Sequence, residues 1–264
     1  MILKGRTICR GNAEGTVLKL DEPLSFLGGV DSATGNVKNG RGNVSGKILV
    51  FPKGKGSTVG SYVMYDLKSR GKAPKAVINS SAETIVATGA VISSIPMVDG
   101  IDVRLILDND RISVDADSGT VELPDVRMRT VASSVVLVDG KILMLHRPET
   151  AKSYPGYWSL CAGKKEEGEE IEETASREIF EETRISAKAP IKSLPPVYVR
   201  EDSTVWEVYT FIFDAGSQKP VLNKENTEYR LVALDELKTM KLVDYTYEVA
   251  EELLRQNQES KDFC

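Results

Sequence analysis

Alternating apolar and polar positions predict short strands in the first half of the chain. Apolar, β-branched runs bounded by turn residues occupy residues 47–51, 76–79, 91–98, 103–107 and 112–114. Residues 57–70, between the first two runs, carry a helical pattern, for which we expect Ser57 as the N-cap and Gly71 just past the end. Many glycines in the first fifty residues indicate turns between brief strands. The succession of strand, glycine turn, helix and strand predicts an α/β unit.

The pattern changes after a short, proline-containing joint near Asp125, so we expect two domains, residues 1–126 and 127–264. Residues 131–138 and 141–146 form strands around Asp139-Gly140, a dipeptide that favours a tight hairpin. A helix is expected from Glu169. Further strands are predicted at residues 197–200, 205–213 and 228–237, and a last helix at residues 245–257.

The helix that begins at Glu169 carries carboxylates on one face. Apolar residues recur every fourth position on another face, at Ile171, Ala175 and Ile179. The carboxylates at i, i+3 and i+4 belong to Glu178, Glu181 and Glu182. Like charges this close repel one another unless a cation lies among them, and hard oxygen ligands suit Mg²⁺ or Mn²⁺. The alternative is an acidic, solvent-facing helix, which is the usual fate of charge-rich runs.

The spacing around this helix resembles the Nudix box. The matching positions are Gly163, Glu169, Arg177, Glu178, Ile179, Glu181, Glu182 and Ile185. Arg184 stands where the family has a glycine that ends the helix in the left-handed conformation. The resemblance implies a Nudix α/β/α sandwich with a mixed sheet and a metal-dependent diphosphate hydrolase.

The same resemblance implies roles for individual residues. Glu178, Glu181, Glu182 and the carbonyl of Gly163 would hold the metal ions, with Glu178 also serving the attacking water. Glu169 and Arg177 would brace the helix through an ion pair. Trp158 matches the approach to the box, whereas Cys161 and Ala162 replace its more usual proline and glycine. Glu225 or Glu228 would be a further metal ligand or, more simply, an exposed carboxylate. His146, the only histidine, is interpreted as a packing or surface residue.

A second candidate site lies in the glycine-serine turn of the first half. Gly54 and Gly56 allow the backbone to approach a ligand, Lys55 and Lys53 add positive charge, and Ser57 lies at the expected helix start. The alternative is that Ser57 only caps the helix.

The order of motifs in the first half, including this turn and the later IVATGAVISSIPMVDG, resembles the small, swivelling subunit of the aconitase X family. Within that family it resembles the archaeal phosphomevalonate dehydratases. The resemblance implies that Gly54, Lys55 and Gly56 bind a small phosphorylated substrate and that Ser57 accepts a proton during dehydration of mevalonate 5-phosphate. Ser61 is a second candidate for that role. It also implies a separate large subunit that carries a 4Fe–4S cluster.

Charge and cysteine content restrict the partners and cofactors that we expect for this chain. The net charge of −5 comes from the second half, because the first 126 residues hold 15 basic and 14 acidic side chains and the rest hold 19 and 25. We therefore expect no nucleic-acid partner. Three distant cysteines, Cys9, Cys161 and Cys264, provide no cluster-ligand set. The absence of a signal peptide or an apolar span predicts a cytoplasmic protein without membrane contact.

Three functional hypotheses remain. The chain is a two-activity enzyme, or its Nudix half senses an isoprenoid or nucleotide diphosphate without cleaving it, or its first half is only an assembly scaffold.

Overall fold

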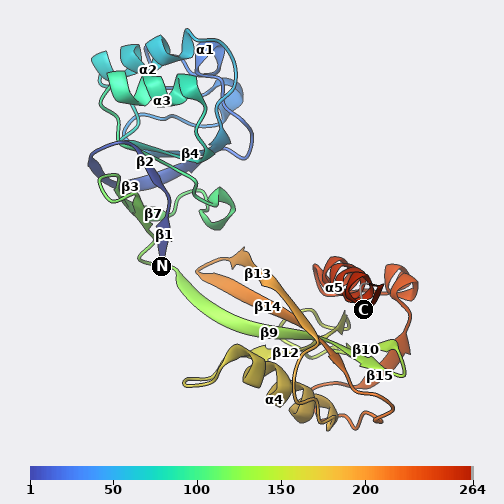
Figure 1. The fold of residues 1–264 in the computed structure, drawn as a ribbon. Coiled ribbons are helices and arrows are strands. Elements are labelled where there is room, and N and C mark those ends of the chain that lie inside the picture. Colours follow the sequence, from blue (N-terminus) through green and yellow to red (C-terminus); the bar gives the residue numbers. More distant parts are fainter. Residues whose placement is uncertain (263–264) are drawn as a thin grey trace. The chain divides into compact units, whose positions relative to one another are not determined.

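The structure is a computed structural model that describes residues 1–262 (Figure 1). Cys264 lies outside the described residues. The chain divides into two compact units. The first comprises Met1–Arg127 together with the short segment Arg200–Val205, and the second comprises the other described residues. No helix among the described residues is both long and apolar enough to cross a membrane.

An eight-stranded mixed sheet forms the framework of the first unit, in the order β1-β8-β7-β3-β4-β5-β6-β2. Strands β3 to β6 run parallel to one another, and the remaining pairs are antiparallel. The strands are β1 (Ile2–Lys4), β2 (Arg6–Cys9), β3 (Asn12–Lys19), β4 (Ile48–Lys53), β5 (Ala76–Ser81), β6 (Met97–Asp99), β7 (Arg111–Asp115) and β8 (Thr120–Glu122). The helical elements are α1 (Phe26–Gly29), η1 (Lys38–Gly40), α2 (Gly60–Ser69), α3 (Thr84–Ile92) and η2 (Val103–Leu105).

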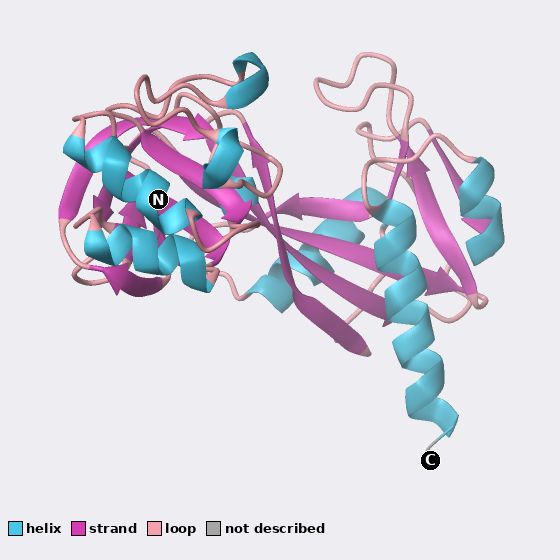
Figure 2. Ribbon diagram, turned by 90° about the horizontal axis from the view of Figure 1, so that it is seen from above, coloured by secondary structure: helices cyan, strands magenta, loops and turns pink. Residues whose placement is uncertain are grey.

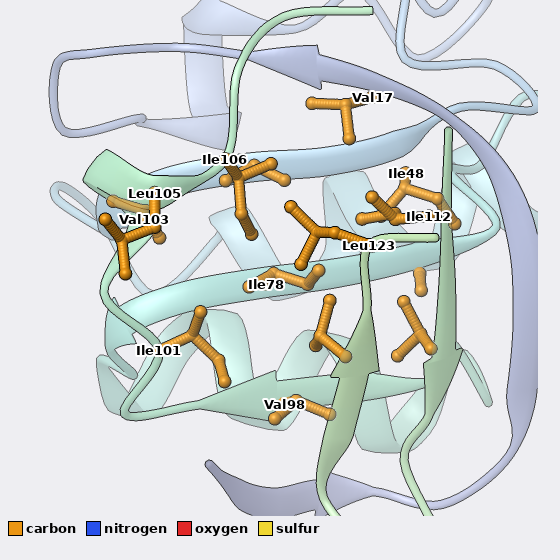
Figure 3. Close-up of a cluster of buried hydrophobic side chains, with 14 of the residues drawn as sticks. Val17, Ile48, Ile78, Val98, Ile101, Val103, Leu105, Ile106, Ile112 and Leu123 are labelled. Carbon is orange, nitrogen blue, oxygen red and sulfur yellow. The ribbon is translucent and has the colours of Figure 1, made fainter. Parts of the chain in front are cut away.

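The parallel strands bury both faces, which explains their continuous apolar runs. On one face, Leu49, Phe51 and Val77 pack against α2 and α3. On the other face, Ile48 and Ile78 lie in a cluster with side chains of η2, β7 and β8, as Figure 3 shows. Val205, from the segment contributed by the second half of the sequence, is fully buried in the same cluster.

Of the expected strands in this unit, the one at residues 91–98 is correct only at its end and the one at residues 103–107 is wrong. The strand expected at residues 91–98 is reduced to its end, which lies in β6, because α3 extends to Ile92 with Val86, Gly89 and Ala90 buried at helical spacing. Gly89 allows α3 to approach α2, since a Cβ there would lie 2.5 Å from the sulfur of Met64. Residues 103–105 form η2, which begins where the Asp102 carboxylate accepts a hydrogen bond from the backbone N–H of Arg104. The strands expected at residues 47–51, 76–79 and 112–114 are confirmed.

The second unit is a mixed sheet between two helices (Figures 1 and 2). Its strands are β9 (Arg127–Val138), β10 (Lys141–His146), β11 (Trp158–Ser159), β12 (Cys161–Lys164), β13 (Lys192–Glu201), β14 (Thr204–Asp214) and β15 (Glu228–Val232). Its helical elements are α4 (Ile171–Thr183), η3 (Leu234–Thr239) and α5 (Thr246–Asp262). The Asp139-Gly140 hairpin is confirmed, with positive φ at both residues.

Alternate residues of β9 face opposite sides of the sheet in the second unit. Val136 packs in a cluster with Ala175 and Ile179 of α4. Val135 lies in the other cluster, which includes Leu253 of α5. The predicted α/β/α arrangement is therefore confirmed, and the apolar face predicted for α4 is the one that anchors it to the sheet. The strand predicted at residues 228–237 ends at Val232, after which η3 begins.

Candidate functional site

Helix α4 is defined at both ends by local interactions. The side chains of Glu170 and Glu173 form a capping box at its start. At its end Arg184 adopts the left-handed conformation, with φ 58° and ψ 11°, and its N–H donates to the carbonyl of Phe180. Its guanidinium also lies over the Phe180 ring. Arg184 therefore takes the conformation for which a glycine is preferred at this position, and the helix ends there.

Gly163, on β12, and Glu178, on α4, are in direct contact. A Cβ on Gly163 would lie 1.8 Å from the carboxyl carbon of Glu178, so no side chain fits at residue 163 while Glu178 keeps this position. Burial raises the pKa of Glu178, and the Arg177 guanidinium opposes that rise. The approach of helix and strand thus places one carboxylate against the backbone of β12.

Glu182 is the most deeply buried carboxylate of α4, with 8 % of the residue exposed. It accepts hydrogen bonds from the N–H of Ala162 at 3.2 Å and from Nδ2 of Asn226 at 3.3 Å. Burial raises its pKa to about 8, and the nearby carboxylates of Glu178 and Glu225 add to the rise. Glu178 and Glu225 thus disfavour the charged form of Glu182, and a bound cation would offset that repulsion.

Arg177 braces the helix in the predicted way. Its Nε lies 2.7 Å from Oε1 of Glu169, and its Nη2 donates to the carbonyl of Lys164 at 3.1 Å. This pairing lowers the pKa of Glu169 to about 2. Arg177 Nη1 also contacts Glu178 at 2.8 Å and Glu181 at 3.3 Å.

The structure separates Glu181 from the buried pair, because its side chain is 53 % exposed. Among the side chains that the structure describes, no three of His, Cys, Asp or Glu are grouped closely enough to hold a metal ion in this conformation. The guanidinium of Arg177, which contacts both Glu178 and Glu181, and the turning of Glu182 toward Ala162 account for this spacing.

Other residues singled out from the sequence are distributed around the second unit. Glu225 is close enough to Glu178 and Glu182 to raise the pKa of both, whereas Glu228 pairs with Arg230 on the surface. Burial raises the pKa of the Cys161 thiol, and Glu182 adds to the rise. Cys161 is therefore a packing residue beside the carboxylates.

His146 and Trp158 also pack together. Their ring centroids lie 4.8 Å apart, and Nδ1 of His146 is 2.8 Å from the hydroxyl of Thr227. His146 is thus a packing residue, as predicted, and it lies on the strand that pairs with β11.

The glycine-serine turn follows β4 in the first unit. Ser57 is exposed and is not the N-cap of α2, which begins at Gly60 with Val59 in the cap position. The expected cap is wrong because a turn comes first: the N–H of Gly60 donates to the carbonyl of Ser57, and the N–H of Val59 approaches its Oγ at 3.4 Å. Gly56 has φ +106°, and a Cβ there would meet Oγ of Ser25 at 2.6 Å.

Residues beside the turn differ in their accessibility. Ser61 is 7 % exposed, and its hydroxyl donates to the carbonyl of Thr58. Lys55 is exposed, its N–H donates to the carbonyl of Leu24, and its ammonium forms no ion pair within the described part of the chain. Of the two serines, Ser57 is the one that a ligand can reach.

Known proteins resemble the two halves separately. The aconitase X swivel domain model matches residues 2–123, and the NUDIX domain model matches residues 128–253. The phosphomevalonate dehydratase small subunit of Thermococcus kodakarensis is 59 % identical over 128 residues, which are 47 % of this chain and 96 % of that protein. Its counterpart in Methanosarcina acetivorans is 51 % identical over 129 residues, covering 46 % and 90 %.

The first half belongs to the aconitase X swivel family, and the second half is a Nudix domain. Among solved structures, the aconitase X of Thermococcus kodakaraensis is 60 % identical and covers 47 % of this chain and 98 % of its own, with a TM-score of 0.46. A MutT protein from Methanosarcina mazei is 26 % identical and covers 50 % and 96 %, with a TM-score of 0.44. By the two family models and the named small subunits, the chain joins an aconitase X swivel domain to a Nudix domain.

Sequence reasoning missed two polar residues that the structure places at these sites. Asn226 donates to Glu182 from a loop 44 positions further along the chain, and no local pattern distinguishes it. Glu83 lies against the glycine-serine turn, in a segment for which we expect no helix or strand from the sequence. The acidic residue just before an apolar nine-residue run was a signal for a helix start that could have drawn attention to it.

Proposed function

We propose that residues 1–126 act as the small subunit of a dehydratase that converts mevalonate 5-phosphate to its anhydro product, trans-anhydromevalonate 5-phosphate. A separate large subunit would carry the 4Fe–4S cluster. The similarity to named small subunits carries this proposal, because this chain covers 96 % of the length of the Thermococcus kodakarensis protein at 59 % identity. Within the described residues, Cys9 and Cys161 lie in different units, so a separate cluster-bearing chain fits the cysteine content.

The glycine-serine turn supplies the residues for this role. Ser57 would accept the proton, since it is exposed whereas Ser61 is buried and already donates to a backbone carbonyl. Gly54 and Gly56 let the backbone come close to the substrate, and the Lys55 ammonium would pair with its phosphate. A serine accepts a proton only where its alkoxide is stabilised, and backbone N–H groups around the turn would contribute to that.

Co-expression with the large subunit from the same organism tests this proposal. The two chains should copurify, and the complex should convert mevalonate 5-phosphate to a product that has lost one water, as detected by mass spectrometry. A complex that forms but leaves the substrate unchanged would support the scaffold hypothesis instead. Failure of the chains to associate would refute the proposal entirely.

For residues 127–264 we propose a diphosphate hydrolase that depends on Mg²⁺ or Mn²⁺. The supporting observation is that burial raises the pKa of Glu178 and of Glu182, and that the nearby Glu225 carboxylate adds to both rises, so a cation would stabilise their charged forms. Their oxygens are the hard ligands that these cations prefer, and Glu178 lies against Gly163, whose carbonyl would be a further ligand. Glu181 would join them only if its side chain leaves Arg177.

The chain's own groups have distinct tasks in this proposal. A bound cation would neutralise the diphosphate and lower the pKa of a water molecule. The Glu178 carboxylate would orient that water and accept its proton. Arg177 and Glu169 hold the helix in place, and the N–H of Ala162 fixes the Glu182 carboxylate. Arg184 takes the expected helix-ending conformation, so its presence does not argue against turnover.

A non-catalytic sensor is the alternative for this half. Arg177 favours it, because its guanidinium contacts both Glu178 and Glu181 as a metal ion would. A panel of isoprenoid and nucleoside diphosphates, assayed for phosphate release with Mg²⁺ or Mn²⁺, distinguishes the two. Metal-dependent release that Glu181→Gln reduces at least tenfold supports the hydrolase. Binding of a diphosphate without release supports the sensor.

A further inference from the structure

Glu83 lies beside the glycine-serine turn although it is distant in sequence. Strands β4 and β5 are parallel, so their carboxyl ends meet at the same edge of the sheet. The turn begins at Gly54, directly after β4, and Glu83 occupies the N-cap position of α3, shortly after β5. In open α/β sheets this edge is where ligands bind.

The Glu83 carboxylate rests on the backbone of the turn. A Cβ at Gly54 would lie 3.0 Å from Oε2 of Glu83 and 3.4 Å from its Cβ, and 2.5 Å from a methyl group of Val86. Any larger residue at position 54 would push the turn away from α3. The glycine therefore permits a close approach between the turn and this one carboxylate.

Oε2 of Glu83 is buried and accepts no hydrogen bond from the described residues. Although Glu83 is the N-cap of α3, its side chain makes no capping hydrogen bond. Four buried side-chain atoms share this lack of a partner, in Asn79, Glu83, Ser93 and Thr210. Only the one in Glu83 belongs to an ionisable group, for which the loss of solvation costs most. A buried carboxylate oxygen without a hydrogen-bond donor calls for an explanation, such as a donor that reaches it when a ligand binds or the backbone changes conformation.

The turn carries a donor that matches this acceptor. The Ser57 hydroxyl, three residues after Gly54, donates no hydrogen bond within the described part of the chain, and its oxygen is only weakly engaged by the N–H of Val59 at 3.4 Å. Gly56 lies between Gly54 and Ser57 in the sequence and has φ +106°. A glycine at this position allows the backbone of the turn to change conformation.

We propose that Glu83 is a positioning residue for Ser57. When the turn engages substrate, the Ser57 hydroxyl donates to Oε2 of Glu83, which orients a lone pair of the serine oxygen toward the substrate proton. As that oxygen takes the substrate proton, its own hydroxyl proton passes to Oε2, so Ser57 stays neutral and Glu83 ends protonated. This inference rests on the proposed dehydratase function and adds to it a residue with a defined role. It requires a rearrangement of the turn and no movement of α3.

The test uses the complex of the full chain with the large subunit and the isosteric variant Glu83→Gln. We expect kcat to fall by about a hundredfold, because an amide oxygen can accept the hydrogen bond of Ser57 but cannot take its proton, while KM stays within about twofold. Because the carboxylate has no partner in the free chain, its replacement should not lower the thermal midpoint. A purely structural Glu83 would show the opposite pattern, a lower midpoint with kcat preserved.

A double-variant cycle with Ser57→Ala isolates the coupling between the two residues. Once Ser57 is absent, Glu83→Gln should slow the enzyme no further. Independent, multiplying effects would overturn the proposal, as would a Glu83→Gln rate within twofold of wild type. Glu122→Gln, an exposed acid on β8, is the matched control and should leave the rate unchanged. An inactive wild-type complex would instead refute the proposed dehydratase function itself, and this inference with it.

Discussion

Replacing Gly163 with alanine tests whether the contact between β12 and α4 places the Glu178 carboxylate for Nudix chemistry. The added Cβ would lie 1.8 Å from the carboxyl carbon and 1.9 Å from Oε1 of Glu178. An ordinary contact is about 3.4 Å, so the carboxylate must move by roughly 1.6 Å. Gly163 does not have a positive φ, so alanine adds a clash without straining the backbone.

The size of the expected effect follows from that displacement. Misplacing a reacting group by 1 Å costs about a hundredfold in rate, so metal-dependent diphosphate release should fall at least that far. The clashing atoms form the end of a flexible side chain, which can swing away from the new methyl group. The cost in stability should therefore be near the lower limit for overpacking, about 1 kcal/mol.

Two measurements decide the outcome of this substitution. Hydrolysis is followed by phosphate release over the diphosphate panel, and Mn²⁺ binding is followed by electron paramagnetic resonance, which needs no substrate. Gly29→Ala is the control, because its Cβ would find its nearest neighbour at an ordinary 3.7 Å. A Gly163→Ala protein that binds Mn²⁺ and releases phosphate as the wild type does would refute the assigned role of this contact.

Three further predictions concern α4 and its surroundings. The ion pair with Arg177 lowers the pKa of Glu169 to about 2 from its ordinary 4.5, so its stabilisation is complete above pH 4.5 and is lost as the pH falls toward 2. Thermal midpoints between pH 2 and 6 should show this loss in the wild type and not in Glu169→Gln; identical profiles would contradict it. Arg184→Gly should raise the free energy of unfolding by about 0.5 to 1 kcal/mol, because glycine adopts positive φ without strain. A marked decrease of that free energy in a urea titration would argue against this explanation. Asn226→Ala removes a hydrogen-bond donor to the buried Glu182 and should lower the free energy of unfolding by about 1 to 3 kcal/mol in the same urea titration. An unchanged midpoint would show that this hydrogen bond does not stabilise the fold.

Local patterns predicted the second half of the fold well. The Asp139-Gly140 turn and the apolar spacing of Ile171, Ala175 and Ile179 are properties of neighbouring residues, and the structure agrees with both. The strand predicted at residues 103–107 was wrong because apolar content cannot distinguish a buried strand from a buried 3₁₀ turn.

At the candidate sites, too, contacts within a sequence motif were predictable, whereas contacts between segments far apart in the sequence were not. The ion pair of Arg177 with Glu169 was implied by the resemblance to the Nudix box, in which both residues match fixed positions. The contacts of Glu182 with Asn226 and of Glu83 with the glycine-serine turn depend on how distant segments pack. No signature near Asn226 indicates its contact, and the sequence around Glu83 signals only a helix start. The separation of Glu181 from Glu182 likewise depends on Arg177 and Ala162 and not on helical spacing alone.

Dehydration of mevalonate 5-phosphate by the complex with the large subunit tests the central claim most directly. Wild type should yield a product lacking one water, Ser57→Ala should reduce its formation by at least a hundredfold, and Ser61→Ala should retain most of it, because the Ser61 hydroxyl is buried and donates to Thr58. An intact complex in which Ser57→Ala turns over at the wild-type rate would contradict the account.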